Sequence, residues 1–170
     1  YKYSELVEDE GRTALHLRQF QTSYNGNGTW MTDTRSHYRV KEGFDANEYG
    51  IFQLSYKIAS AKNVPTGTTP ENVTEDALYE HTQPAFCGFI YYGPNTFYGG
   101  SNGLMYIGNN GALPLIYDNE YHTFEIDQSL PENNKPSTPW TSGENGKIYG
   151  FALDLVLCNY SSDVYVDSVR

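Results

Sequence analysis

Alternation of apolar and polar residues with a period of two is the feature that most constrains how this chain folds. The clearest stretch, 50–60, has apolar side chains at every second position: Phe52, Leu54, Tyr56 and Ile58. The same alternation, or a short apolar run, recurs at 13–20, 86–92, 104–107, 121–127, 149–160 and 164–169. This periodicity predicts half-buried antiparallel strands, because successive side chains of a strand point to opposite faces. No stretch indicates a helix longer than about two turns.

Loops rich in Gly, Asn and Pro separate these predicted strands. The long ones span 63–80, 93–103 and 130–146. Seven or more short strands joined by such loops are typical of two sheets packed face to face. We therefore predict an all-β fold, a two-sheet antiparallel jelly-roll β-sandwich, with residues 1–170 forming a single domain. The predicted core residues are Phe52, Leu54, Phe124, Ile126, Phe151, Leu153, Leu155 and Leu157.

The charge of the chain excludes two classes of partner. Asp and Glu total 21 against 11 Lys and Arg, which gives a formal net charge of -10. Such a molecule repels polyanions, so we expect neither nucleic acid nor an anionic membrane as a partner. The mean hydropathy is -0.61, and no stretch reaches the roughly 20 apolar residues that span a bilayer. The 16 tyrosines suit a surface whose rings are apolar and whose tips are polar.

Motifs of common catalytic sites are absent from the sequence. It contains no Gly-x-Ser-x-Gly, His-Glu-x-x-His, Gly-x-Gly-x-x-Gly or phosphate loop, and its four histidines are scattered. Glu125 and Asp127 share one face of a predicted strand, as the acid and nucleophile of a glycosidase would. They resemble the start of the Glu-x-Asp-x-x-Glu signature of jelly-roll glucanases, but Gln128, Ser129, Leu130 and Pro131 follow where the further Glu should stand. We interpret them as the polar side of an amphipathic strand and keep a small glycosidase as the weakest alternative.

The cysteines and the chain ends give weaker indications. Cys87 and Cys158 each lie in an apolar run and are interpreted as buried free thiols, with a disulfide as the alternative. The chain begins at Tyr1 without a signal-peptide pattern, so we expect a segment of a longer protein. Sequons occur at Asn27, Asn72 and Asn159 and are weak evidence for a eukaryotic secretory route.

Two stretches of the C-terminal part carry a family resemblance. One is 118–127, Asp-Asn-Glu-Tyr-His-Thr-Phe-Glu-Ile-Asp; the other runs from Trp140 through 146–153 to 164–169, Val-Tyr-Val-Asp-Ser-Val. Together they resemble jelly-roll carbohydrate-binding modules attached to polysaccharide-degrading enzymes, of the family 11, 4 and 22 type. The segment 44–49 fits the same modules, and the acidic opening 7–11 looks like that of family 11.

The resemblance implies a non-catalytic module rather than an enzyme. Such a module targets a covalently linked catalytic or scaffold domain to plant cell-wall β-glucan, xylan or mannan. It implies a monomer, secreted or at the cell surface. The alternative is a surface adhesin or structural jelly-roll domain that binds a protein partner.

The resemblance also implies a structural Ca²⁺. In many such modules calcium joins the acidic N-terminal stretch to an aspartate of the last strand. The matching positions are Glu8, Asp9 or Glu10, and Asp167, and we name Glu8, Glu10 and Asp167 as the expected ligands. Calcium takes roughly 6–8 oxygen ligands, which carboxylates and carbonyls supply. The alternative is a solvated acidic end.

A sugar has apolar C–H faces and polar edges, so a site for it combines aromatic rings with hydrogen-bonding groups. The strand phasing places Gln53, Ser55 and Lys57 opposite the core, on a face that Asp154 of another strand shares and that His16 and Arg18 are expected to join. For Asp154 the alternative is an ion pair with Arg18 or Lys57. Trp140 is interpreted as a packing residue. The predicted ligand-binding residues are Trp30, Tyr24, Tyr38, Arg18, Gln53, Tyr91, Tyr98, Tyr106 and Asp154.

Overall fold

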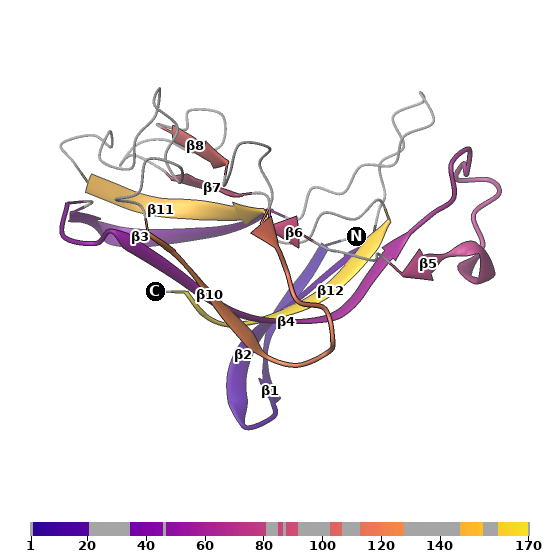
Figure 1. Ribbon diagram of the computed structural model, residues 1–170, viewed down its shortest axis with the longest axis horizontal. Helices are drawn as coiled ribbons and strands as arrows, with labels where there is room; N and C mark the ends of the chain where they lie inside the picture. Colours follow the sequence, from indigo (N-terminus) through magenta and orange to yellow (C-terminus); the bar gives the residue numbers. More distant parts are fainter. Residues whose placement is uncertain are drawn as a thin grey trace.

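Two antiparallel sheets form the body of the protein in the computed structural model, which describes residues 2–20, 35–45, 47–80, 85–86, 88–91, 103–106, 113–127, 147–154 and 160–169. Figure 1 shows β3 and β11 as a second layer above β4 and β10. This is the predicted jelly-roll β-sandwich. The only helical element among the described residues is a short 3-10 turn, η1 (Glu75–Ala77). None of the described helical structure is long and apolar enough to cross a membrane.

The larger sheet has six strands in the order β1–β2–β12–β4–β10, with β5 paired to the far end of β4. Its strands are β1 (Lys2–Asp9), β2 (Arg12–Phe20), β12 (Ser161–Val169), β4 (Ile51–Asn63), β10 (His122–Asp127) and β5 (Tyr79–Glu80). The first and last strands of the chain thus lie in the same sheet, two positions apart.

The smaller sheet has four strands in the order β3–β11–β7–β8. They are β3 (Arg35–Asp45), β11 (Lys147–Asp154), β7 (Gly88–Tyr91) and β8 (Gly103–Tyr106). A separate pair consists of β6 (Ala85–Phe86) and β9 (Leu113–Pro114). The predicted strand 86–92 is therefore two short strands. The predicted strand 149–160 corresponds to β11 only as far as Asp154, because 155–159 lie outside the described residues.

The hydrophobic core lies on the inner face of the six-stranded sheet. The apolar positions of β4 alternate as predicted, and Leu54 and Ile58 are completely buried. Val164 and Val166 of β12 pair with the same strand and continue the core, as does Ile126 of β10. Phe124 packs against this cluster while partly exposed. The side chains of Phe151, Leu153, Leu155 and Leu157 lie outside the described part.

Two tyrosines attach the segment 115–117 to β4. The hydroxyl of Tyr56 accepts a hydrogen bond of 2.9 Å from the backbone N–H of Ile116. The hydroxyl of Tyr117 accepts one of 3.2 Å from the backbone N–H of Ala61 and donates one of 2.6 Å to Glu80. Leu115 is thereby buried in the core.

The N-terminal hairpin turns at two residues with positive φ, Glu10 at 51° and Gly11 at 75°. This is the backbone of a type I′ turn, which glycine adopts without strain. The strand β2 pairs with β12 only from Leu15 to Phe20. The tip of the hairpin therefore extends beyond the sheet pairing, and its side chains reach the outer face of β4.

Candidate functional site

Four predicted ligand residues lie on the four-stranded sheet, in two rows set by the strand register. Phe151 of β11 is paired with Tyr38 on one side and Tyr91 on the other. Asp154 is paired with Arg35 and Gly88, and Gly88 is in turn paired with Tyr106. The register thus places Asp154 and Tyr106 in one row and Tyr38 and Tyr91 in another, each pair with one strand between its members.

These two rows occupy opposite faces of the sheet. Phe151 and Asp154 are three residues apart on one strand, and neighbouring positions of a strand alternate between faces. Asp154 and Tyr106 therefore share a face with Arg35, whereas Tyr38 and Tyr91 share the other face with Phe151. A single face cannot present all four residues.

The remaining predicted residues of the described part, Arg18 and Gln53, lie in the six-stranded sheet. Arg18 pairs with Asp163 through Nε at 3.1 Å. Gln53 donates a hydrogen bond of 2.6 Å to Glu125. The expectation that Gln53 and Asp154 share one face is wrong, because β4 and β11 belong to different sheets. Strand phasing identifies the face of a strand but not the sheet to which the strand belongs.

The polar face of β4 is buried at its centre. Ser55 and Lys57, which the phasing placed there, are only 5% and 4% exposed. Lys57 and Arg18, the alternative partners for Asp154, bind other carboxylates in the six-stranded sheet. Around Lys57, the face predicted for sugar binding is therefore occupied by ion pairs within the protein.

Other predicted features lie outside the described residues. These are Trp30, Tyr24, Tyr98, Trp140, Cys87 and Cys158, together with the sequons at Asn27 and Asn159. Asn72 lies exposed in a turn, where its side-chain oxygen accepts a hydrogen bond of 2.6 Å from the backbone N–H of Thr69.

The three predicted calcium ligands each have a protein partner. Glu8 accepts a hydrogen bond of 2.7 Å from the hydroxyl of Thr13. Glu10 pairs with Lys57 at 2.9 Å. Asp167 pairs with Arg12 at 2.9 Å and accepts a hydrogen bond of 3.2 Å from Ser55. No group of three or more His, Cys, Asp or Glu within the described ranges is placed to hold a metal ion. The calcium site stays a prediction.

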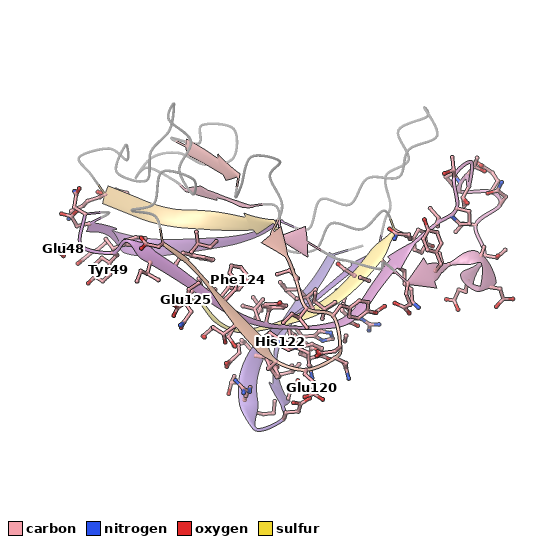
Figure 2. The ribbon with its side chains drawn as sticks, viewed as in Figure 1. Glu48, Tyr49, Glu120, His122, Phe124 and Glu125 are labelled. Atoms are coloured by element: carbon pink, nitrogen blue, oxygen red, sulfur yellow. The ribbon has the colours of Figure 1, made fainter. Side chains whose placement is uncertain are left out.

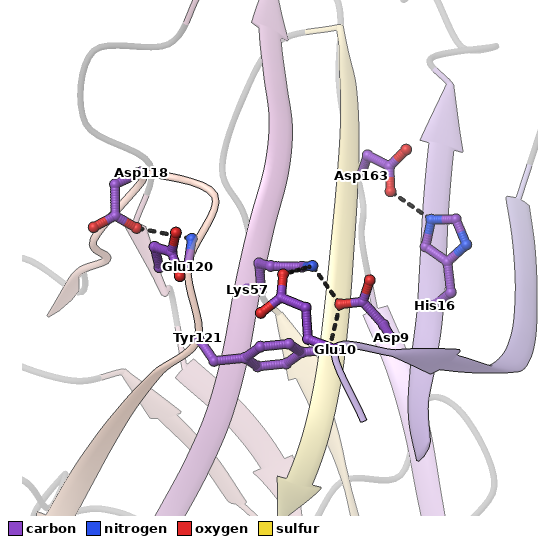
Figure 3. Close-up of polar contacts among 8 residues, drawn as sticks. All are labelled: Asp9, Glu10, His16, Lys57, Asp118, Glu120, Tyr121 and Asp163. Atoms are coloured by element: carbon purple, nitrogen blue, oxygen red, sulfur yellow. Dashed lines mark hydrogen bonds and ion pairs between the residues drawn. The ribbon is translucent and has the colours of Figure 1, made fainter. Parts of the chain in front are cut away.

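Lys57 is the centre of a polar cluster that the sequence reasoning missed (Figure 3). Its ammonium group contacts Asp9 as well as Glu10, and Asp9 also accepts a hydrogen bond of 2.9 Å from the hydroxyl of Tyr121. The ammonium nitrogen lies 4.6 Å from the ring centroid of Tyr165 and 5.0 Å from that of Tyr121. The sequence shows a lysine midway along an alternating strand. It does not show the partners of this lysine, because they come from distant segments.

Two further side chains continue this arrangement on either side. The guanidinium carbon of Arg12 lies 4.5 Å from the ring centroid of Tyr121. On the other side His16 stacks on Tyr165, with ring centroids 4.3 Å apart and an angle of 7° between the planes. His16 also bonds Asp163 at 2.5 Å. We call Asp9, Glu10, Arg12, Lys57, Tyr121 and Tyr165 the Lys57 cluster.

The charges of the Lys57 cluster shift its pKa values in the directions expected of an ion pair. The hydrogen bond from Lys57 lowers the pKa of Asp9, against the opposing effect of burial. Burial by itself would lower the pKa of Lys57, but the hydrogen bonds and charges of Asp9 and Glu10 outweigh it and raise that pKa. Burial, together with the neighbouring carboxylate of Asp9, raises the pKa of Tyr121. Both members of the Lys57–Asp9 pair are therefore charged at neutral pH.

The carboxylates considered for glycoside hydrolysis lie on the edge strand β10. Figure 2 shows Glu120, His122, Phe124 and Glu125 along this part of the chain. Glu125 is exposed and accepts the hydrogen bond from Gln53, while Asp127 is opposite Ile51 in the register. These surroundings of Glu125 fit its predicted place on the polar side of an amphipathic strand.

No protein-family model and no curated protein matches this sequence. The fold is similar to a family 11 carbohydrate-binding module from Clostridium thermocellum in complex with a β-1,3-1,4-mixed-linked tetrasaccharide, with a TM-score of 0.55 and 13% identity over 99% of this chain and 81% of that chain. The family 11 module of a cellulosomal cellulase of Clostridium thermocellum gives a TM-score of 0.55 and 13% identity, over 99% and 79%. The solution structure of CtCBM11 gives a TM-score of 0.52 and 13% identity, over 99% of this chain and 80% of that chain. The resemblance to jelly-roll carbohydrate-binding modules is thus confirmed at the level of the fold.

Proposed function

We propose that this chain is a non-catalytic carbohydrate-binding module that binds a β-glucan on one face of its four-stranded sheet. The observation that carries the proposal is the fold shared with a module whose structure holds a β-1,3-1,4-mixed-linked tetrasaccharide. Xylan and mannan are the two alternative ligands, and binding to them is to be measured beside binding to β-glucan.

The face we propose is the one shared by Asp154 and Tyr106. Two rows of the register fall on it: Arg35, Asp154, Gly88 and Tyr106 in one, and His37, Ala152, Ile90 and Leu104 in the other. Charged residues are rarely placed against an apolar core, because burying an unpaired charge is costly. This face is therefore the one we assign to solvent.

The opposite face suits the interior of the sandwich. Its rows consist of Tyr38, Phe151, Tyr91 and Gly103, and of Ser36, Leu153, Phe89 and Met105. These positions are mostly apolar, as a face packed on another sheet requires. We accordingly retain Asp154 and Tyr106 as ligand residues and propose that Tyr38 and Tyr91 pack inside.

The solvent face combines the two kinds of position that a sugar needs. Apolar and aromatic positions suit the C–H faces of pyranose rings, and charged or polar positions suit the hydroxyl groups. The proposal includes a covalently linked glycan-degrading or scaffold domain and a secreted or cell-surface location, because a cell-wall polysaccharide lies outside the cell.

Affinity electrophoresis in gels that contain mixed-linked β-glucan, xylan or mannan tests the proposal. We expect the protein to be retarded by mixed-linked β-glucan. Tyr106→Ala and Asp154→Ala should each weaken binding about tenfold, the equivalent of about 1.4 kcal/mol. Thr123→Ala, an exposed position of β10 in the other sheet, is the matched control and should bind as the unchanged protein does.

Two results would contradict the proposal. Migration unaffected by every polysaccharide would remove the binding function. Loss of binding in Thr123→Ala, with Tyr106→Ala and Asp154→Ala unaffected, would move the site to the six-stranded sheet. Release of reducing sugar that Glu125→Gln abolishes would establish the glycosidase alternative instead.

A further inference from the structure

The acidic end of this chain is built around an internal cation. Asp9 and Glu10 lie at the tip of the N-terminal hairpin, beyond the part of β2 that pairs with β12. Both carboxylates contact the ammonium group of Lys57, which comes from the middle of β4. Lys57 therefore links the hairpin tip to a distant strand, since it lies 47 residues beyond Glu10 in the sequence.

Lys57 is buried in a way that its partners explain. The residue is 4% exposed, and a buried ammonium group destabilises a protein unless it is paired and hydrogen-bonded. Two carboxylates supply the pairing, and the rings of Tyr165 and Tyr121 lie within 5.0 Å of the ammonium nitrogen, at a distance typical of cation–π contacts. These contacts offset the cost of burying the cation.

Arg12 performs the same task for the C-terminal strand. It pairs with Asp167 at 2.9 Å and lies over the ring of Tyr121, which itself donates a hydrogen bond to Asp9. The N-terminal hairpin is thus joined to β12 and to β4 by two positive side chains. The connection to β12 is the one that the family resemblance assigns to calcium.

The residues present do not fit a calcium ion at this place. Calcium requires roughly 6–8 oxygen ligands, whereas Asp9, Glu10 and Asp167 already accept bonds from Lys57 and Arg12. Glu8, the remaining expected ligand, accepts a hydrogen bond from Thr13. A divalent cation among them would also be repelled by both positive side chains. The donor set is therefore that of an ion-pair cluster.

We propose that Lys57 takes the place of a metal ion as the cation that fastens the N-terminal hairpin to the outer face of the six-stranded sheet, so that this end of the fold is stable without Ca²⁺. The proposal stands apart from sugar binding, because it concerns the other sheet.

Thermal unfolding of the whole chain, in excess EDTA and in millimolar CaCl₂, tests the proposal. We expect the two melting temperatures to coincide and terbium luminescence to show no saturable site. A melting temperature that rises with CaCl₂ and falls with EDTA would overturn the proposal, as would saturable terbium binding that Asp9→Asn or Asp167→Asn removes.

A substitution of the cation itself gives the second arm. Lys57→Gln should lower the melting temperature clearly more than Lys62→Gln, whose lysine forms an ion pair with Glu80 at the far end of β4 and is more exposed. Equal effects of the two substitutions would contradict the role of Lys57. If Lys57→Gln fails to fold, the measurements with EDTA, CaCl₂ and terbium on the unchanged chain still decide the question.

Discussion

At the scale of single residues, tyrosine shows how far composition can mislead. The 16 tyrosines suggest a surface for ligands, yet several of the described ones stabilise the fold. Tyr56 and Tyr117 bind backbone groups of neighbouring segments, and Tyr121 and Tyr165 enclose Lys57. A phenol can serve either purpose, since it has an apolar ring and a polar tip. Only the contacts of each ring distinguish the two uses.

Gly43 gives the first prediction. A Cβ atom at this position would lie 2.9 Å from three atoms of the Tyr149 ring, so the ring packs against the bare backbone of β3. We expect Gly43→Ala to destabilise the protein by about 1–3 kcal/mol, because the ring or the strand must move. Gly50→Ala is the control, as nothing lies within 4 Å of its Cβ position. Urea unfolding measures both, and equal effects would contradict this packing.

Asp9 gives the second prediction. Its pKa is lowered in the folded state, chiefly by the hydrogen bond from Lys57. Its ionised form therefore stabilises the fold above the ordinary aspartate pKa of about 3.9, and this stabilisation is lost as the pH falls through the lower, folded-state value. The difference in unfolding free energy between the unchanged protein and Asp9→Asn should be constant from about pH 5 to 8 and shrink below about pH 4. Urea unfolding over a pH series measures it; a difference that persists undiminished in acid would disprove an ionic role for Asp9.

At the scale of elements, β4 organises the six-stranded sheet. It pairs with β12 and β10 along its length and with β5 at its end, and it receives the segment 115–117 on its inner side. Its outer side carries Lys57 and the hairpin tip. The alternation of this strand was the strongest signal in the sequence, because both of its faces have a defined environment.

The sequence pattern did not predict β1, β3 or the two-residue strands β5 and β9. For the two long strands there is a physical reason. β1 and β3 contain many charged residues, among them Glu5 and Glu8 in β1 and Arg39, Lys41 and Glu42 in β3. β1 is an edge strand whose Leu6 is 72% exposed. Its residues therefore do not alternate between a buried apolar face and a polar face. Charged residues are common on edge strands because they prevent pairing with other chains. The acidic end of β1 was instead interpreted as a calcium-binding stretch.

The attachment of segment 115–117 gives the third prediction. Tyr56→Phe removes the acceptor for the backbone N–H of Ile116 and should destabilise the protein by about 0.5–1.5 kcal/mol, the net contribution of one hydrogen bond. Tyr79→Phe is the control, because Tyr79 is 51% exposed and should change stability by less than about 0.5 kcal/mol. Thermal unfolding compares the two variants. If Tyr56→Phe is as stable as Tyr79→Phe, the hydroxyl of Tyr56 is not what holds the segment.

At the scale of the whole molecule, the net charge of -10 gives the fourth prediction. A neutral β-glucan carries no charge to attract or repel, so its dissociation constant should change less than about twofold between low and high NaCl concentration. An anionic polysaccharide should be bound negligibly at low salt, because the protein repels it. Isothermal titration calorimetry at two salt concentrations measures the first effect. A steep salt dependence would point to a charged ligand.

The sequence by itself determined the local properties of this protein. The period-2 pattern determined that the chain is all β, where most of its long strands lie and which face of β4 and β10 is apolar, because these properties depend on residues one or two positions apart. It also determined that His16 and Arg18 lie on the face of β2 opposite the core, to which their neighbours Leu15 and Leu17 contribute. Pattern reasoning located the core of the larger sheet correctly.

Only the tertiary structure decided which strands share a sheet and which distant charges meet. Gln53 and Asp154 fall in different sheets, although each occupies a polar position of a predicted strand, and Tyr38 falls on the opposite face from Asp154. Arg12 and Asp167 are 155 residues apart in sequence, yet they pair across the sheet. Strand pairing and register arise from long-range packing of whole elements, which no local pattern records.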